Sequence, residues 1–371
     1  MQAKKFLQIY RDEAQPLVQE FFGKWRQQAQ TAGLVTKEVM ERLADLYPRG
    51  KQLRGALTVL GYELAEGKNK VDILKASITI ELLETSLLIA DDVFDEDEKR
   101  RGILTVHKQW EKIFQEFNIQ HRAKHGQGSG LKVSALSSKK YGQDMAHITS
   151  IIGFHLAPWL LMQTAFSEKI KTKALEFYCL SCVETVLGEA LDISSPWQSF
   201  KDKQTSAQTI HDYKTVRYSA VLPLKFGALL AGAQDKDWLS NLEKYALVLG
   251  RVFQIQDDIL GSFGNPKITG KANDNDIKGA RWTILVELLW QKIDKKEKPF
   301  FRQIFEKTQK TDQDVRQVKT LMKKYKIVEA AQVRAEKFLR EGLQVVPKIT
   351  QNKKHQDTLE NLLKFMLKRV K

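Results

Sequence analysis

Three aspartates at the end of a long apolar segment are the first residues whose types and spacing suggest chemistry. Asp91 and Asp95 stand four positions apart with Asp92 beside them, so a helix would gather three carboxylates on one patch. Such a patch repels itself unless cations lie in it, and its oxygen ligands suit Mg²⁺ bound together with substrate phosphates. The alternative is a solvated acidic helix end, because residues 96–98 continue the negative charge.

A second acidic pair lies in another apolar segment. Asp257 and Asp258 follow Gln254 at spacings of three and four, which places all of them on one helical face. Burying carboxylates is costly unless something compensates for the lost hydration. Two acidic patches that face one another would form a cage for several Mg²⁺ around one diphosphate. The two patches together therefore predict a site that binds a diphosphate leaving group.

Basic side chains occur in compact groups that would suit the same site. Guanidinium groups bind phosphate oxygens through paired hydrogen bonds, so arginines close to an acidic patch suit diphosphate recognition. Each group alone is weak evidence, because most basic residues are solvated surface charges. The candidates are Lys51, Arg54, Arg100, Arg101, Lys214, Lys271 and Arg281.

The segments that must position these residues are predicted to be helices. Residues 78–90 and 245–260 are apolar on nearly every face and each leads into one of the acidic groups, as expected of central helices. From about residue 295, Leu, Val and Phe stripes alternate with charged faces. Few Gly and Pro are present, 21 and 8, which disfavours a strand-rich fold. We predict an all-α chain, one large helical bundle around a central cavity spanning residues 1–371, with a flexible insertion at about 111–142.

The net charge and the distribution of apolar residues limit the classes of protein to which this chain can belong. Sixty basic and 45 acidic residues leave a net charge of +15, which attracts polyanions without choosing among them. No nucleic-acid-binding motif accompanies the charge. No run of about 18 uncharged apolar residues suggests a membrane span, and the N-terminal segment carries charges where a secretory signal would be apolar. We expect a cytoplasmic enzyme that binds neither nucleic acid nor a membrane through a spanning helix.

Six short motifs in a fixed order resemble those of the trans-prenyl diphosphate synthases, the polyprenyl synthetase family, and among them most of all the geranylgeranyl diphosphate synthases. The resemblance runs from about Gly50 to Thr283, and six motifs in order are far more specific than any one. The motifs are GKQLR at 50–54, DDVFD with KRRG at 91–102, GEALD at 188–192, YKTVRY at 213–218, FQIQDDILG at 253–261 and TGKANDNDIKGAR at 269–281.

The resemblance implies a fold, a reaction and metal ions. The fold would be the all-α type I isoprenoid synthase fold. The reaction would join isopentenyl diphosphate to dimethylallyl, geranyl or farnesyl diphosphate through ionisation, condensation and elimination, and the family is usually homodimeric. Three Mg²⁺, which Mn²⁺ can replace, would be held by Asp91, Asp92, Asp95, Asp257 and Asp258.

The resemblance also implies roles for the other site residues. Arg100, Lys214 and Lys271 would bind the allylic diphosphate, with Arg281 lining the same cavity. Lys51, Arg54 and Arg101 would bind the diphosphate of isopentenyl diphosphate, and Phe253 would pack on its hydrocarbon part. The Lys214 carbonyl, the Thr215 hydroxyl and the Gln254 amide oxygen would face the allylic cation.

Product length would be set by side chains below the first acidic motif. Ser86 and Leu87 stand where enzymes of the family that make farnesyl diphosphate often carry aromatic residues, so a serine suggests a longer product. Leu83, one turn deeper, would then form the floor. We therefore expect geranylgeranyl diphosphate as the product.

Some positions depart from the family pattern, and two other functions remain possible at this stage. Glu84 stands where His or Gln is usual, and a carboxylate there would repel phosphate unless it is protonated or paired, so it receives no binding role. Glu189 replaces a usual Gln, and Trp282 a frequent basic residue. A non-catalytic subunit of a heteromeric synthase is one alternative. A class I terpene cyclase is the other, although the QIQDD sequence at 254–258 argues against it.

Overall fold

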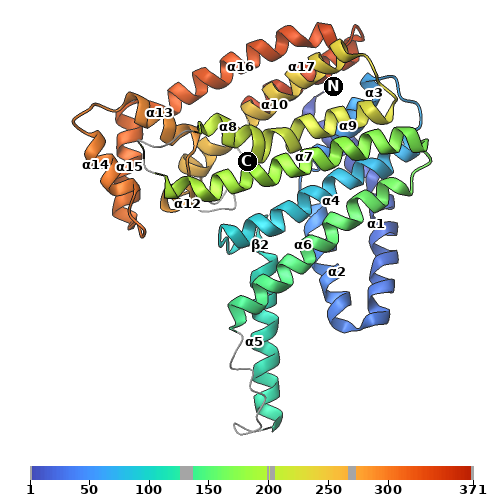
Figure 1. The fold of residues 1–371 in the computed structure, drawn as a ribbon, viewed down its shortest axis with the longest axis horizontal. Helices are drawn as coiled ribbons and strands as arrows, with labels where there is room; N and C mark the ends of the chain where they lie inside the picture. The colour runs from blue at the N-terminus through green and yellow to red at the C-terminus, as the bar shows by residue number, and fades with distance from the viewer. Residues whose placement is uncertain (1, 126–136, 199, 201–204, 266–272, 369–371) are drawn as a thin grey trace. The chain divides into compact units, whose positions relative to one another are not determined.

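The computed structural model describes residues 2–125, 137–198, 200, 205–265 and 273–368. Its elements are almost all helical, as the sequence predicts (Figure 1). Contacts between Cα atoms divide the chain into two compact units. Unit 1 comprises Met1–Ile9, Ala56–Ile73 and Phe166–Lys371, and unit 2 comprises Tyr10–Gly55 and Leu74–Ala165. The expectation of one continuous domain stays a prediction.

Unit 2 is built from the first helices of the chain, and a short antiparallel pair of strands follows the first acidic motif. The strands pair Lys99 with Leu104 and Arg100 with Ile103. Helices α1, α3 and α4 begin in one unit and end in the other. The elements are α1 (Ala3–Ala32), α2 (Leu34–Leu46), the 3₁₀ turn η1 (Tyr47–Arg49), α3 (Leu53–Leu64), α4 (Lys70–Phe94), β1 (Lys99–Arg100), β2 (Ile103–Leu104), α5 (Val106–His125) and α6 (Ser138–Met162).

Unit 1 holds the remaining helices. Helix α10 is its centre, and α16 and α17 pack along it (Figure 1). The elements are α7 (Glu168–Ser194), the 3₁₀ turn η3 (Ser195–Trp197), α8 (Ala207–His211), the π-helix η4 (Asp212–Val221), α9 (Leu222–Leu230), α10 (Lys236–Phe263), α12 (Asn275–Lys278), α13 (Ile284–Lys292), α14 (Lys298–Phe305), α15 (Asp312–Lys324), α16 (Ile327–Ile349) and α17 (Lys353–Leu367).

The two apolar segments singled out in the sequence form the buried helices that carry the acidic motifs. Residues 76–86 of α4 are buried without interruption, and α10 is buried along one face and begins at the N-cap Asp235. The Asp235 carboxylate accepts hydrogen bonds from the backbone N–H groups of Asp237 and Trp238, which satisfies donors that the first helical turn cannot. Both central helices are therefore positioned by burial of their apolar faces.

A cluster of aromatic and aliphatic side chains forms part of the core of unit 1. Phe200 lies edge-on to Trp282 with ring centroids 5.4 Å apart, and both belong to one buried cluster with Phe301 and Phe305. Trp282, which replaces a frequent basic residue of the family, is thus a core residue here. Its ring stabilises the segment that leads from the last motif into α13.

Both ends of the insertion expected at 111–142 are helical and not irregular. Helix α5 continues to His125 and α6 begins at Ser138, and the two lie side by side (Figure 1). The Ser137 hydroxyl accepts from the Lys140 backbone N–H and so caps α6. The glycine-rich part at 126–136 lies outside the described residues, so the flexibility of the insertion stays a prediction.

Helix α6 has one property that the sequence search for uncharged segments did not detect. Its length and a mean hydropathy of 1.3 over its most apolar window meet the criteria for a helix that could cross a membrane. Half of that window is buried inside the structure, and a core helix meets the same criteria. Among the described residues it is the one helix to do so.

Candidate active site

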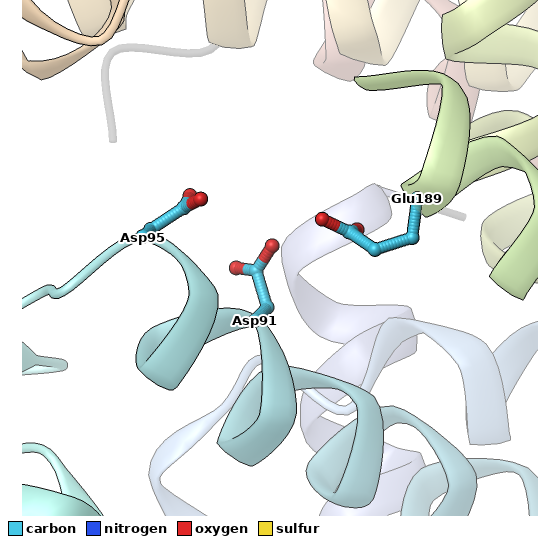
Figure 2. A group of neighbouring side chains, drawn as sticks. All are labelled: Asp91, Asp95 and Glu189. Carbon is cyan, nitrogen blue, oxygen red and sulfur yellow. The ribbon is translucent and has the colours of Figure 1, made fainter. Parts of the chain in front are cut away.

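The first acidic motif lies at the C-terminal end of α4, in unit 2. Asp91 is partly exposed and Asp95 exposed, and carboxylate oxygens of the two lie within 4.8 Å of one another (Figure 2). The C-terminal end of a helix carries a partial negative charge, so acids there are unfavourable without a nearby cation. Two accessible carboxylates at this spacing offer hard oxygen ligands of the kind that Mg²⁺ prefers.

Asp92 has a different environment from its two neighbours. Its side chain is buried and forms an ion pair with the Arg100 guanidinium. The same guanidinium lies 2.9 Å from an Asp91 oxygen and 3.6 Å from an Asp97 oxygen. Burial would lower the pKa of Arg100, but these carboxylates raise it above its ordinary value. Asp92 and Arg100 therefore hold the end of α4 and the strand β1 together.

The basic residues expected to bind isopentenyl diphosphate also lie in unit 2. Arg54, at the start of α3, is buried, Arg101 follows β1, and Lys51 is exposed. Arg101 donates to the Leu46 carbonyl oxygen over 3.3 Å. A side chain at Gly50 would place its Cβ only 2.7 to 2.8 Å from the Arg101 guanidinium. The glycine of the first motif thus leaves room for the observed position of the Arg101 guanidinium.

The backbone around this basic group adopts uncommon conformations. Gln52 and Arg101 both have φ near +52°, in the left-handed region that residues with a side chain enter at some cost. Gly102 follows with φ of 82°. Such conformations often occur at functional sites, where the surrounding structure maintains them. The backbone therefore turns directly after Lys51 and at Arg101 itself.

Glu84 is buried between the two arginines. Its Oε1 lies 2.6 Å from Arg54 Nη1 and 3.0 Å from Arg101 Nη2. Burial would raise the pKa of Glu84, but the two guanidinium groups lower it below its ordinary value. A carboxylate was expected to be compatible with phosphate at this position only if it was protonated or paired. The structure shows a paired carboxylate.

The residues expected to limit product length lie on the same helix. Leu83 and Ser86 are fully buried and Leu87 is partly exposed. The Ser86 hydroxyl donates to the Leu82 carbonyl oxygen over 2.8 Å, and the Ser150 hydroxyl donates to the Ser86 carbonyl oxygen. A Cβ at Gly153 of α6 would collide with the Ser86 hydroxyl. The space beside Ser86 is therefore filled by α6, and Leu87 is the more accessible of the two.

In unit 1, the second acidic motif lies on α10, and its two aspartates differ in exposure. Asp257 is exposed and Asp258 is buried. Asp258 accepts hydrogen bonds of 2.9 Å from Gln254 Nε2 and from the Ile284 backbone N–H, and His211 Nε2 lies 3.6 Å away. Burial above all raises the pKa of Asp258 to about 7. Asp257 is thus accessible to solvent, whereas Asp258 holds α10 to the start of α13.

Four charged side chains of unit 1 form one ion-pair network. Lys214 Nζ lies 3.0 Å from Glu189 Oε2 and 2.7 Å from Asp192 Oδ2, and Arg281 Nη1 lies 2.8 Å from the same Asp192 oxygen. Glu189 and Asp192 are on α7, where Figure 2 draws Glu189. Neither acid was predicted to have a role, although their spacing of three on one helical face was a signal. Their carboxylates orient two of the predicted substrate-binding cations.

The π-helix η4 carries Lys214 and Thr215, and the sequence did not reveal its geometry. A side chain on Gly188 would collide with the backbone of η4 at Lys214, so the glycine of the GEALD motif lets α7 and η4 approach. A π-helix widens the backbone turn and frequently occurs at functional sites. Gln254 and Phe253 on α10 are partly exposed. Lys271 lies outside the described residues.

Three comparisons with known proteins agree with these features. The family model described as polyprenyl synthetase matches residues 36–118 and 132–322. A geranylgeranyl diphosphate synthase from Methanosarcina mazei is 26% identical over 238 residues, which are 64% of this chain and 62% of that relative. A farnesyl pyrophosphate synthase from Mus musculus is 27% identical over 299 residues, 77% of this chain and 73% of that relative. The match with the first relative thus spans less than two thirds of its length.

Comparison with solved structures supports the fold. A crystal structure of geranylgeranyl pyrophosphate synthase from Corynebacterium glutamicum, complexed with isoprenyl diphosphate and magnesium, has a TM-score of 0.84 to this chain. It is 22% identical, and the match covers 100% of both chains. The type I isoprenoid synthase fold expected from the sequence is therefore confirmed. Because the family model matches most of the chain, this protein belongs to the polyprenyl synthetase family of prenyltransferase enzymes.

Proposed function

We propose that this protein condenses isopentenyl diphosphate with an allylic diphosphate to form a trans-prenyl diphosphate and inorganic diphosphate. The observation that carries the proposal is the pair of accessible carboxylates, Asp91 and Asp95, whose oxygens lie within 4.8 Å at the end of a buried helix. Such a pair is suited to a divalent cation that also binds phosphate oxygens. Family membership supports the same reaction type.

The metal-binding residues would be the accessible aspartates of both motifs. Asp91 and Asp95 from α4 and Asp257 from α10 would supply the ligand oxygens for Mg²⁺, with Asp92 and Asp258 holding their helices in position. We propose that acids of both motifs bind the same substrate diphosphate through Mg²⁺, and that three Mg²⁺ are bound in all. When bound, the metal ions neutralise the charge that develops on the departing diphosphate.

The remaining residues would bind the two substrates and protect the cation. Arg100, Lys214 and Lys271 bind the allylic diphosphate, and their existing carboxylate partners keep the first two oriented. Lys51, Arg54 and Arg101 bind the diphosphate of isopentenyl diphosphate. The Lys214 carbonyl, the Thr215 hydroxyl and the Gln254 amide oxygen stabilise the allylic cation by their partial negative charge. In Gln254 the amide nitrogen donates to Asp258, which directs the amide oxygen away from that carboxylate.

The product is proposed to be geranylgeranyl diphosphate. Leu83, Ser86 and Leu87 carry no aromatic ring on the helix that ends in the first acidic motif, and the resemblance associates aromatic rings there with the shorter farnesyl product. Leu87 is the partly exposed member of the three and therefore the one best placed to contact a product. The curated relatives carry the names of enzymes with different product lengths, so length must be measured on this chain.

An activity assay tests the proposal directly. The purified chain is incubated with Mg²⁺, isopentenyl diphosphate and, separately, dimethylallyl, geranyl or farnesyl diphosphate, and the prenyl alcohols are identified after phosphatase treatment. We expect geranylgeraniol as the main product and loss of turnover when EDTA removes the metal. Absence of turnover by the chain alone would favour a non-catalytic subunit. Activity that persists in EDTA would contradict the metal role.

We further propose that the protein is a homodimer in which α7 lies at the interface. Every exposed residue of α7 between Cys179 and Ile193 is uncharged, and Leu180, Val183, Val186 and Leu187 are 54 to 59% exposed. Isolated apolar residues are normal on a surface, but a continuous apolar stripe marks an interaction site. A second copy of the chain is the occupant we propose, because an identical uncharged stripe would complement it by twofold symmetry.

Helix α6 in unit 2 also has a largely apolar stripe of exposed residues, to which the same reasoning applies. Its exposed residues after Asp144 are Ile148, Ile151, His155 and Met162, which recur on one helical face. This stripe accounts for the high hydropathy of α6 without a bilayer. A cytoplasmic location, expected from the sequence, stays a prediction.

A further inference from the structure

A buried acid lies between two of the residues assigned to isopentenyl diphosphate. Arg54 from α3 and Arg101 from the turn after β1 are far apart in sequence, yet both guanidinium groups contact the same Glu84 oxygen, at 2.6 and 3.0 Å. Glu84 is 6% exposed, so the pair of contacts is shielded from water. Removing one partner of a buried ion pair is costly, because the other charge is left uncompensated.

The charge state of this group follows from its neighbours. Glu81, one turn earlier on α4, is also buried and accepts a hydrogen bond of 2.6 Å from the Gly55 backbone N–H. Burial and then the nearby Glu84 raise the pKa of Glu81 to about 8, whereas the pKa of Glu84 is lowered by its arginines in spite of burial. The two acids therefore carry one negative charge near neutral pH, and Glu84 bears it.

We propose that the Glu84 carboxylate acts as an internal anion that competes with the diphosphate of isopentenyl diphosphate for Arg54 and Arg101. This inference rests on the proposed function, which assigns that diphosphate to these two arginines. Each guanidinium gives one N–H to Glu84, and Arg101 gives another to Leu46. Fewer donors then remain for phosphate oxygens, and the paired carboxylate cancels part of the positive charge that would attract the diphosphate.

The competition weakens this site selectively. A negative charge fixed beside a phosphate-binding pair lowers its affinity for an anion, and the effect is large where water is excluded. Arg100, assigned to the allylic diphosphate, forms a separate ion pair with Asp92. Glu84 therefore raises the Michaelis constant for isopentenyl diphosphate and leaves that for the allylic substrate unchanged.

The substitution Glu84→Gln tests the effect of the charge alone. Glutamine is neutral but keeps an acceptor oxygen on a side chain of the same length. We expect the KM for isopentenyl diphosphate to fall by about tenfold, the equivalent of removing one nearby charge, with kcat and the KM for the allylic substrate within about twofold. Glu41→Gln is the matched control, since Glu41 accepts from Arg26 over 2.8 Å elsewhere in unit 2. It should leave all three constants unchanged.

The outcomes separate this inference from the proposed function. If the unaltered protein shows no condensation, the proposed function fails. If the unaltered protein turns over but Glu84→Gln has an equal or higher KM for isopentenyl diphosphate, the competition is refuted and the function stands. Glu84→Ser, a second neutral variant, is measured in parallel with thermal unfolding of both. Loss of the fold in both variants would also refute the proposal, because the carboxylate would then serve the core.

Discussion

At the scale of single residues, the five aspartates of the two acidic motifs have two kinds of environment. Asp91, Asp95 and Asp257 have accessible carboxylates, whereas Asp92 and Asp258 are buried and engaged by Arg100 and by the start of α13. Carboxylates that solvent reaches can exchange a present partner, such as Arg100 at Asp91, for a cation, whereas breaking the contacts of buried and hydrogen-bonded carboxylates costs more. The first group is therefore expected to determine catalysis, and the second to determine the position of the first.

Replacing Asp91 by Asn tests its metal role with little change in volume. We expect kcat/KM for the condensation to fall by roughly 100-fold or more, because the amide cannot neutralise a divalent cation that stabilises the leaving group. The melting temperature should remain close to that of the unaltered protein, since Asp91 is partly exposed. Asp144→Asn, at an exposed partner of Lys140, is the control. An Asp91→Asn variant with full activity would contradict the metal role.

The protonated state of Glu81 predicts a pH-dependent stability. Its pKa in the folded chain is about 8, above the ordinary value of 4.5, so between these values the unfolded chain releases a proton that the folded chain keeps. The free energy of unfolding therefore loses a contribution as pH rises from about 4.5 to 8. Glu81→Gln, which resembles the protonated acid, should avoid this loss.

Urea unfolding of both proteins at pH 5 and pH 8 measures that difference. The free energy of unfolding of Glu81→Gln, relative to the unaltered protein, should be higher at pH 8 than at pH 5. Glu41→Gln serves again as the control and should show no such change. Parallel pH dependence of Glu81→Gln and the unaltered protein would show that Glu81 is ionised in the fold.

At the scale of elements, the site depends on how closely neighbouring helices approach. The π-helix η4 carries Lys214 against α7, and Gly188 leaves room for it. On the other side, Arg251 of α10 holds Asp212, the first residue of η4, with hydrogen bonds of 3.0 and 2.7 Å. The position of Lys214 and Thr215 is thus set by backbone packing on one side and by an ion pair on the other.

Gly188→Ala tests this close approach. The added methyl group would collide with the backbone at Lys214, so we expect a loss of about 1 to 3 kcal/mol in the free energy of unfolding and a lower kcat. Gly23→Ala in α1 is the matched control, because a Cβ there meets nothing within 4 Å. Alanine in a helix interior should stabilise that position by about 0.5 to 1 kcal/mol. Equal effects of the two substitutions in denaturant unfolding and assay would refute the packing argument.

At the scale of the whole molecule, each unit carries part of the predicted machinery. Unit 2 contains the first acidic motif and the arginines assigned to isopentenyl diphosphate, and unit 1 contains the second acidic motif with Lys214 and Arg281. Neither unit alone holds the full set of proposed residues. A complete catalyst would therefore require both units, and the apolar stripes on α6 and α7 suggest that it also associates with a second copy.

The proposed dimer makes a prediction about mass in solution. Light scattering during size-exclusion chromatography should give twice the chain mass of 42.6 kDa for the unaltered protein. Val183→Asp should shift the mass toward that of one chain, because a buried unpaired charge is costly at an interface. Val333→Asp, at an exposed apolar position on α16, should not change the mass. A monomeric unaltered protein, or a dimer that Val183→Asp does not weaken, would contradict the interface.

The sequence by itself determined the family, the all-α class and the helices that carry the motifs. Long apolar segments with few glycines and prolines permit little except buried helices, and six motifs in one order are too specific to recur by chance. The first acidic group taken together with the second acidic pair was also sufficient to predict a divalent metal, because spacing along a helix follows from local geometry.

Only the tertiary structure decided which residues are accessible and which partners they have. It showed that Asp258 binds the start of α13, that Ser86 packs against Gly153, that Trp282 belongs to the core and that Glu84 joins Arg54 to Arg101. Each of these depends on a neighbour far away in the chain. The sequence lists residue types in order, but burial and ion pairing arise when distant segments come together, and they set the charge and the availability of each side chain.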